Sequence, residues 1–140
     1  MKHLLLSLPL LLLACSSEPT SPQKAEGPTC PTAEQIDSIF SPYAKGDYEA
    51  YIQQIHSLRH LPAARRREHI SLLRQHRVGQ DSTTGPIRHY IQRNIAYKEG
   101  STTATAHLAL IYAPGDTNEI DLPLIWKDHR WWRRYTSYTK

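Results

Sequence analysis

Cysteine is scarce in this 140-residue chain, which contains only Cys15 and Cys30. A small secreted domain held together by disulfides carries a larger, even set of cysteines, so that class is excluded. No apolar run approaches the roughly 20 residues that a membrane-spanning helix needs. Acidic residues are outnumbered, at 13 against 17 lysines and arginines. With 39% apolar residues and a net charge of +4, the composition still predicts a folded domain rather than a disordered chain.

The first 14 residues have the layout of a signal peptide. Lys2 and His3 give a basic start, and residues 4–13 form an apolar run that is too short to span a membrane. The run ends in Leu12, Leu13, Ala14 and Cys15, which resembles the lipobox of bacterial lipoproteins. That resemblance implies that residues 1–14 are removed and that Cys15 receives a diacylglycerol with palmitate-like chains. An ordinary secretory signal with an incidental cysteine is the alternative.

Residues 15–31 are predicted to form a lipidated tether. The stretch holds four prolines and almost no large apolar side chain, so it cannot build a core. Ser16 stands where an aspartate commonly marks inner-membrane retention, which favours the outer membrane and a domain that faces the periplasm. If Cys15 carries lipid, Cys30 has no partner within the chain. We expect Cys30 to be an exposed linker cysteine, with pairing to another molecule as the alternative.

The folded domain is expected over residues 32–140 and to begin with two helices. Thr32 and Gln35 have the spacing of a capping box, and apolar residues follow at helical intervals as far as position 43. Pro42 lacks the N–H that a helix interior needs, so it predicts a kink or an early end. Gly46 and Asp47 then indicate a helix stop and a new N-cap.

A third helix is predicted from Pro62 to about Arg77, with Ile70 and Leu73 facing inward and Gly79 as its stop. After residue 86 the apolar pattern changes to a period of two. Strands are expected at 87–97, 102–112, 120–126 and 131–135, and Pro123 should occupy an edge or a bulge. Three helices followed by an antiparallel meander predict an α+β fold, with the helices packed on one face of the sheet.

Three segments, residues 44–51, 102–105 and 122–131, resemble small bacterial lipoprotein domains of unknown function with the nuclear transport factor 2-like fold. The resemblance implies a curved antiparallel sheet wrapped around helices as a cone, over residues 32–136. In that family an Asp-Gly-Lys-Trp pattern near the end places its tryptophan in the core. Trp131 takes that place here, whereas His129 replaces the glycine, which leaves the turn type open.

The basic run between residues 59 and 77 provides the candidate binding residues Arg65, Arg66 and Arg67. Such a run can bind phosphate groups, here those of anionic lipid head groups or lipopolysaccharide, or it can be a solvated helix face. Nucleic acid is not an expected partner of an envelope protein. Because neighbouring strand residues alternate, Trp132 lies opposite Trp131 and is predicted to be a surface aromatic for partner contact, for example with envelope proteins.

No metal or other cofactor is predicted. His56 and His60 stand four residues apart, but a third ligand is missing. His107 and Asp121 are the strand-borne acid–base candidates, and both lie opposite the apolar face of their strands. The leading hypothesis is therefore a non-catalytic envelope module for binding or scaffolding. The alternative is a small-molecule enzyme of the isomerase or dehydratase kind that uses a cone pocket lined by an acid or a histidine.

Overall fold

The computed structural model describes residues 27–136, apart from the side chains of residues 82–84. The predicted signal peptide, Cys15 and most of the predicted tether therefore lie outside the described residues. The elements in chain order are α1 (Ala33–Ala44), α2 (Tyr48–Gln53), α3 (Ala63–Thr84), β1 (Ile87–Tyr97), β2 (Thr103–Tyr112), β3 (Thr117–Lys127) and β4 (Arg130–Arg133).

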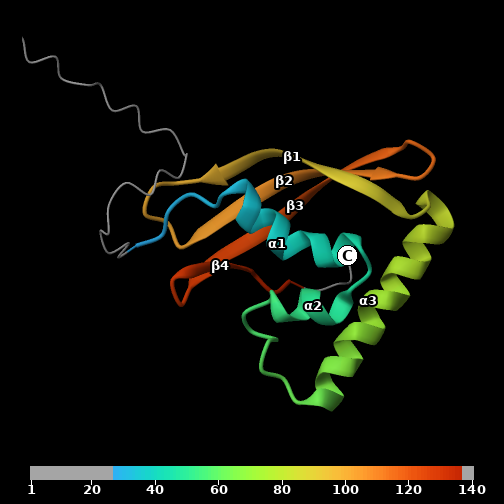
Figure 1. Cartoon of the computed structure of the whole chain (residues 1–140), viewed down its shortest axis with the longest axis horizontal. Coiled ribbons are helices and arrows are strands. Elements are labelled where there is room, and N and C mark those ends of the chain that lie inside the picture. Colours follow the sequence, from blue (N-terminus) through green and yellow to red (C-terminus); the bar gives the residue numbers. More distant parts are fainter. Residues whose placement is uncertain (1–26, 137–140) are drawn as a thin grey trace, which may run out of the picture.

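The four strands form one antiparallel sheet in the order β1-β2-β3-β4, so each strand pairs with the next along the chain. Figure 1 shows α1 lying against one face of the curved sheet, with α2 beside it and α3 projecting away from the sheet. The predicted α+β arrangement is confirmed. Within residues 27–136, no helix combines the length and the apolar character needed to cross a bilayer.

The predicted start and end of α1 are confirmed. The hydroxyl of Thr32 accepts a hydrogen bond from the N–H of Gln35 at 3.2 Å, and the Gln35 side chain accepts one from the N–H of Thr32 at 2.9 Å. Pro42 lies in the last turn, and α1 ends two residues later. Gly46 has a φ of +79°, which reverses the chain, and Asp47 then caps α2 through the N–H of Ala50.

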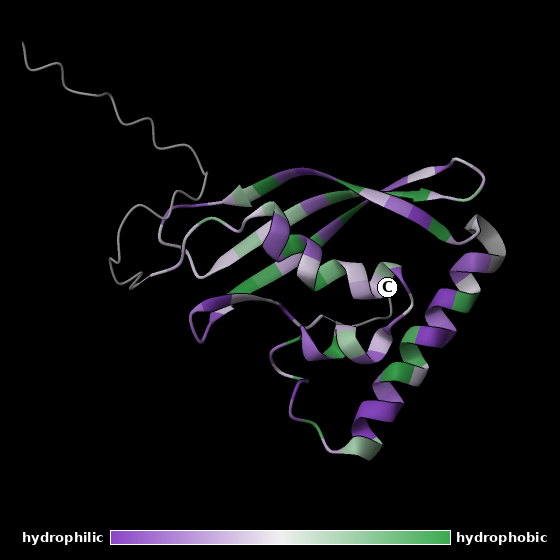
Figure 2. Cartoon of the chain, viewed as in Figure 1, coloured by the Kyte–Doolittle hydropathy of each residue, from purple (hydrophilic) through white to green (hydrophobic). Residues whose placement is uncertain are grey.

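The predicted end of α3 at Gly79 is wrong, because the helix continues to Thr84. A glycine inside a helix costs only about 1 kcal/mol relative to alanine, so it does not by itself end one. The chain leaves the helix at Gly85 instead, where φ is +80°. Figure 2 shows that hydrophilic residues predominate along α3, with short hydrophobic stretches between them.

The main core lies between α1 and the inner face of the sheet. The face of β2 predicted to be apolar is buried throughout, and the other core residues come from α1, β3 and β4. A second cluster joins α2 to α3 through Tyr51, Ile52, Ile55 and Leu73. Ile70 packs at the edge of this cluster, so the predicted inward face of α3 is confirmed.

Pro123 lies in β3 between β2 and β4, just beyond the end of the β3–β4 ladder. The β3–β4 ladder ends at the pair Leu124–Arg133, one residue away. The carbonyl of Pro123 accepts a hydrogen bond from the N–H of Arg134 at 2.9 Å. In a strand, the N–H and C=O of one residue point to the same side. The missing N–H of Pro123 therefore faces Arg134, and the paired residues of β3 and β4 end before this position.

Residues 28–31, predicted as the end of the tether, pack onto the domain. Pro31 is fully buried. The indole of Trp131 donates to the carbonyl of Thr29 at 2.7 Å, and the hydroxyl of Tyr97 donates to the carbonyl of Pro28 at 3.0 Å. Cys30 is half-buried at the edge of the domain, so the expectation of an exposed linker cysteine is wrong.

Candidate functional site

Side chains fill the space between α1 and the inner face of the sheet. Phe40 and Trp131 are each 2% exposed, and Leu108 and Leu124 are completely buried. The ring of Trp131 meets the rings of its aromatic neighbours edge to face, with centroids 5.5 Å from Trp126 and 5.9 Å from Tyr97. The core role predicted for Trp131 is confirmed, and Trp126, which is half-buried, packs against the same core. The interior of the cone is therefore a packed hydrophobic core and not an open substrate pocket.

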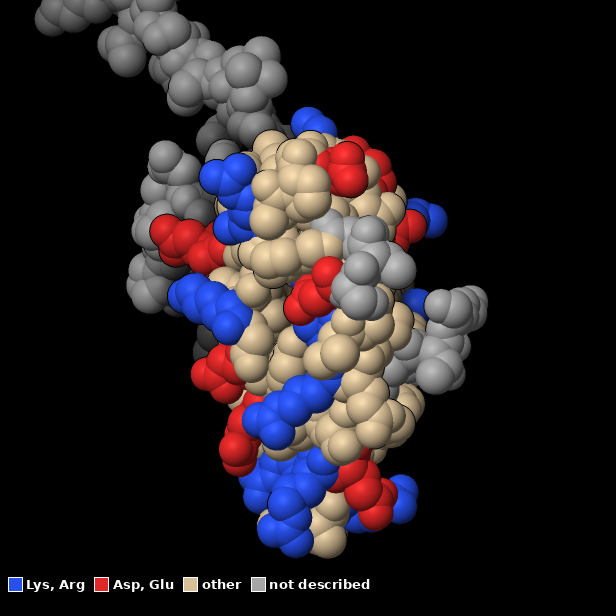
Figure 3. Space-filling model, turned by 90° about the vertical axis from the view of Figure 1, so that its right-hand side faces the viewer, with Lys and Arg blue, Asp and Glu red and all other residues tan. Residues whose placement is uncertain are grey.

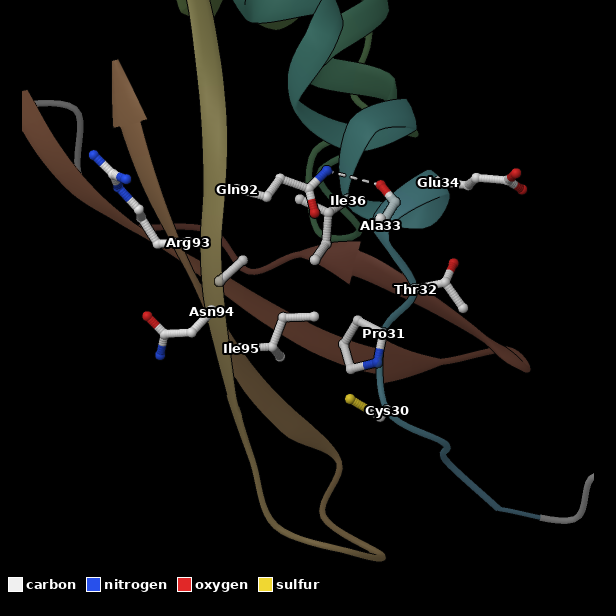
Figure 4. Close-up of a pocket in the computed structure, with 11 residues that line it drawn as sticks. Cys30, Pro31, Thr32, Ala33, Glu34, Ile36, Gln92, Arg93, Asn94 and Ile95 are labelled. Atoms are coloured by element: carbon white, nitrogen blue, oxygen red, sulfur yellow. Dashed lines mark hydrogen bonds between the residues drawn. The ribbon is translucent and has the colours of Figure 1, made fainter. Parts of the chain in front are cut away.

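A hollow of about 730 Å³ opens outside this core, between the start of α1 and β1. Its floor includes Ile36, Ile95 and Ala106, and Gln92 reaches across it to the carbonyl of Ala33 at 2.9 Å. Figure 4 shows the charged ends of Glu34 and Arg93 pointing away from the hollow. No acid or histidine side chain converges on this space from the residues that line it.

The predicted acid–base candidates lie on the outer face of the sheet. His107 and Asp121 are directly opposite each other in the β2–β3 ladder, and their side chains are hydrogen-bonded. Asp121 is 68% exposed. The two groups are therefore paired with each other in contact with solvent, away from the core.

The three consecutive arginines of α3 do not share a surface, because neighbouring helix residues are rotated by about 100°. Arg65 is paired with Glu68 at 3.2 Å, and Arg66 is half-buried. Arg67 is exposed, and Arg74, seven residues further on, lies on the same side of the helix. Figure 3 shows Lys and Arg side chains gathered at one end of this view of the molecule, with further Lys and Arg and several Asp and Glu side chains spread over the rest of the face.

Arg77 belongs to the interior rather than to the basic surface. It is 7% exposed, it forms an ion pair with Asp81 at 2.7 Å, and its guanidinium lies over the ring of Tyr112 at 5.8 Å. Burial raises the pKa of the neighbouring Tyr43 phenol, although the positive charge of Arg77 opposes that rise. The basic run of the sequence is thus divided between the surface and a structural contact of α3 with β2.

Trp132 is 6% exposed, so the prediction of a surface aromatic is wrong. Alternation does place it opposite Trp131, but two arginines cover the ring. The guanidinium carbon of Arg130 lies 3.7 Å from the ring centroid and that of Arg59 lies 4.5 Å from it. The indole N–H donates to the carbonyl of Lys127 at 2.8 Å. Sequence alternation could not reveal this cover, because Arg59 comes from the distant loop before α3.

Asp128 links the β3–β4 turn to the same loop. One of its carboxylate oxygens lies 3.0 Å from the imidazole of His56 and 3.0 Å from the guanidinium of Arg59. These partners, His56 first, hold the pKa of the Asp128 carboxyl below its usual range. Asp128 and His129 both have positive φ, of 50° and 61°, which makes the turn type I′.

His56 is thus engaged by a carboxylate rather than paired with His60. Among residues 27–136, no group of three or more histidine, cysteine, aspartate or glutamate side chains is arranged to hold a metal ion.

No protein family model and no curated protein sequence matches the chain. A solved structure does: a protein from Campylobacter jejuni, described as a candidate nuclear transport factor 2-like transpeptidase, superimposes with a TM-score of 0.57. The match covers 76% of this chain and 100% of that chain, at 11% sequence identity. Identity this low shows the fold alone. The chain therefore has the nuclear transport factor 2-like α+β fold that its sequence motifs resemble.

Proposed function

We propose that this protein is a lipid-anchored component of the bacterial envelope that acts as a non-catalytic binding module. The lipobox-like residues ending at Cys15 support the anchor, and the absence of aspartate at position 16 supports an outer-membrane location facing the periplasm. The filled interior favours a binding module over an isomerase or dehydratase, since such an enzyme needs an open pocket with a convergent acid or histidine.

The structural neighbour's description suggests a second class, a transpeptidase. Covalent peptide transfer requires a nucleophile beside a base that activates it. Cys30 lines the hollow between α1 and β1, but no histidine that could act as its base lines that hollow with it. The arrangement therefore does not favour this chemistry.

The contact surface that we propose is the outer side of α3. Arg67 and Arg74 are exposed there, and neither has an ion-pair partner among the described residues. Val78 follows on the same side, four residues after Arg74, and is 67% exposed. Cations beside an apolar side chain on a projecting helix suit a membrane surface with anionic head groups. This projecting, unpaired basic stripe is the observation that carries the proposal.

Vesicle binding tests this surface. We would compare the mature chain carrying Cys15→Ser, which lacks lipid, with the same chain also carrying Arg67→Gln and Arg74→Gln. Each cation near an anionic surface contributes about 1 kcal/mol. Loss of both should therefore weaken binding to anionic vesicles by about 30-fold. The difference should shrink at high salt, because screening shortens the reach of exposed charges.

The matched control carries Arg88→Gln and Arg93→Gln, which remove two exposed charges from β1 instead. It should bind anionic vesicles nearly as well as the parent chain. Equal weakening by both double variants, or equal binding of the parent to neutral and anionic vesicles, would identify the arginines of α3 as a solvated helix face.

A further inference from the structure

Two guanidinium groups share the single ring of Trp132. Arg130 comes from β4 and Arg59 from the loop before α3, and both lie within 4.5 Å of the same ring centroid. Because both guanidinium groups contact the same ring, they lie close to each other. The edge of the His56 ring also meets this indole, at 5.3 Å between centroids. Cation–π contact fixes both arginines against one platform.

Positive charge exceeds negative charge in this cluster. Among the described residues, Asp128 is the only carboxylate in contact with this cluster. The same oxygen of Asp128 is paired with both Arg59 and His56. Arg130 bonds only to neutral acceptors, the side-chain oxygen of Gln54 at 2.7 Å and the carbonyl of Trp131 at 3.2 Å. Burial, and then the nearby charge of Arg59, lower the pKa of the Arg130 guanidinium.

Both arginines also keep unused donors. The Nε of Arg59 is buried without a hydrogen-bond partner. Within residues 27–136, the Nη1 groups of Arg59 and Arg130 have no hydrogen-bond partner either. The remaining nitrogens hold the two planes in place through Asp128, Gln54 and the Trp131 carbonyl. A ligand that accepts from both arginines would meet groups that are already ordered, which lowers the entropy cost of binding.

We propose that Arg59 and Arg130, held against Trp132, form a binding site for a tetrahedral oxyanion of the phosphate class. The spare donors belong to two separate guanidinium groups, so a ligand with several acceptor oxygens in different directions satisfies them better than a planar carboxylate does. The site goes beyond the proposed function, since it lies at the β3–β4 turn and the loop before α3 rather than on the outer side of α3.

The indole N–H of Trp132 reports on this site directly. We would titrate the mature lipidated protein, in neutral detergent micelles at constant ionic strength, with inorganic phosphate and follow the three indole signals by ¹⁵N NMR. The signal of Trp132, assigned with Trp132→Phe, should shift saturably, while that of Trp131 stays nearly fixed. Acetate should shift it much less. A second titration uses glycerol 3-phosphate, which resembles a lipid head group. Tighter binding of glycerol 3-phosphate than of inorganic phosphate would indicate a head-group ligand, and the reverse would indicate the free ion.

Arg130→Gln should weaken phosphate binding at least tenfold. The matched variant Arg93→Gln, which removes an exposed arginine from β1, should leave binding unchanged. The Trp131 signal shows whether each variant is folded. A Trp132 signal that does not saturate, or equal weakening in both variants, would overturn the site. This titration contains no vesicles, so it tests the phosphate site independently of membrane binding by α3. Each of the two proposals can therefore fail without the other.

Discussion

At the scale of single residues, the β3–β4 turn combines backbone strain with electrostatic support. Residues other than glycine pay roughly 1–2 kcal/mol for a left-handed conformation, and both Asp128 and His129 adopt one. The carboxylate of Asp128 bonds back to His56 and Arg59, which lie far away in the sequence. We infer that these contacts offset the strain and fix the turn against the loop before α3.

Asp128 should make the stability of the protein depend on pH. Because its pKa is lower in the folded state, the contribution of its ion pairs is fully present above the unfolded pKa of about 3.9 and is lost as the pH falls through the folded value. Asp128→Asn keeps a residue that tolerates positive φ but removes the charge. It should lower the melting temperature at neutral pH.

Thermal melts at neutral pH and at a series of pH values below the unfolded pKa of about 3.9 check this linkage. The difference in melting temperature between Asp128→Asn and the parent should shrink steadily as the pH falls through this range. Asp116→Asn, at an exposed turn between β2 and β3, is the control and should melt like the parent at every pH. A deficit of Asp128→Asn that stays the same in acid would remove the electrostatic explanation.

At the scale of elements, the N-terminal edge of the domain carries more structure than its composition indicates. Thr29 and Pro28 supply carbonyls to Trp131 and Tyr97, and Pro31 is buried beside them. A fragment that begins at Gly27 should therefore be more stable than one that begins at Thr32. The two hydrogen bonds alone predict a loss of about 2 kcal/mol.

Urea denaturation of the two fragments measures this difference, with Cys30→Ser in the longer fragment so that thiol chemistry does not enter. Trp131 fluorescence should also change in the shorter fragment, since its indole loses the Thr29 carbonyl. Equal denaturation midpoints for the two fragments would show that the domain begins at Thr32 and that residues 27–31 do not stabilise it.

Elements defined by local chemistry could be predicted from the sequence. The capping box at Thr32, the turn at Gly46 and the alternation in β2 each depend on residues that are close in the chain. Features that depend on distant residues could not. The composition predicted that Pro31 belongs to a linker. Pro31 is buried instead, because Trp131, a hundred residues later, binds the carbonyl of Thr29 in the same segment. Alternation placed Trp132 on the outer face, whereas Arg59 covers it.

At the scale of the whole molecule, the proposed anchor and the proposed contact surface are in different parts of the chain. The described chain begins at one end of the sheet, whereas α3 projects at the other (Figure 1). Residues 15–27, if fully extended, reach about 40 Å. A domain held at Cys15 by a tether of that reach can lie alongside the membrane and bring α3 to its surface. The proposed anchor on Cys15 would hold α3 close to a membrane surface that α3 alone would bind only weakly.

Mass spectrometry of the protein purified from Gram-negative cells tests the anchor most directly. Trypsin should release residues 15–24 as the N-terminal peptide, because the next cleavage site is Lys24. We predict that this peptide begins at Cys15 and carries a diacylglycerol on its sulfur, with alkyne-palmitate incorporated. A chain that still begins at Met1, or a disulfide joining residue 15 to the peptide that contains Cys30, would contradict the lipid anchor.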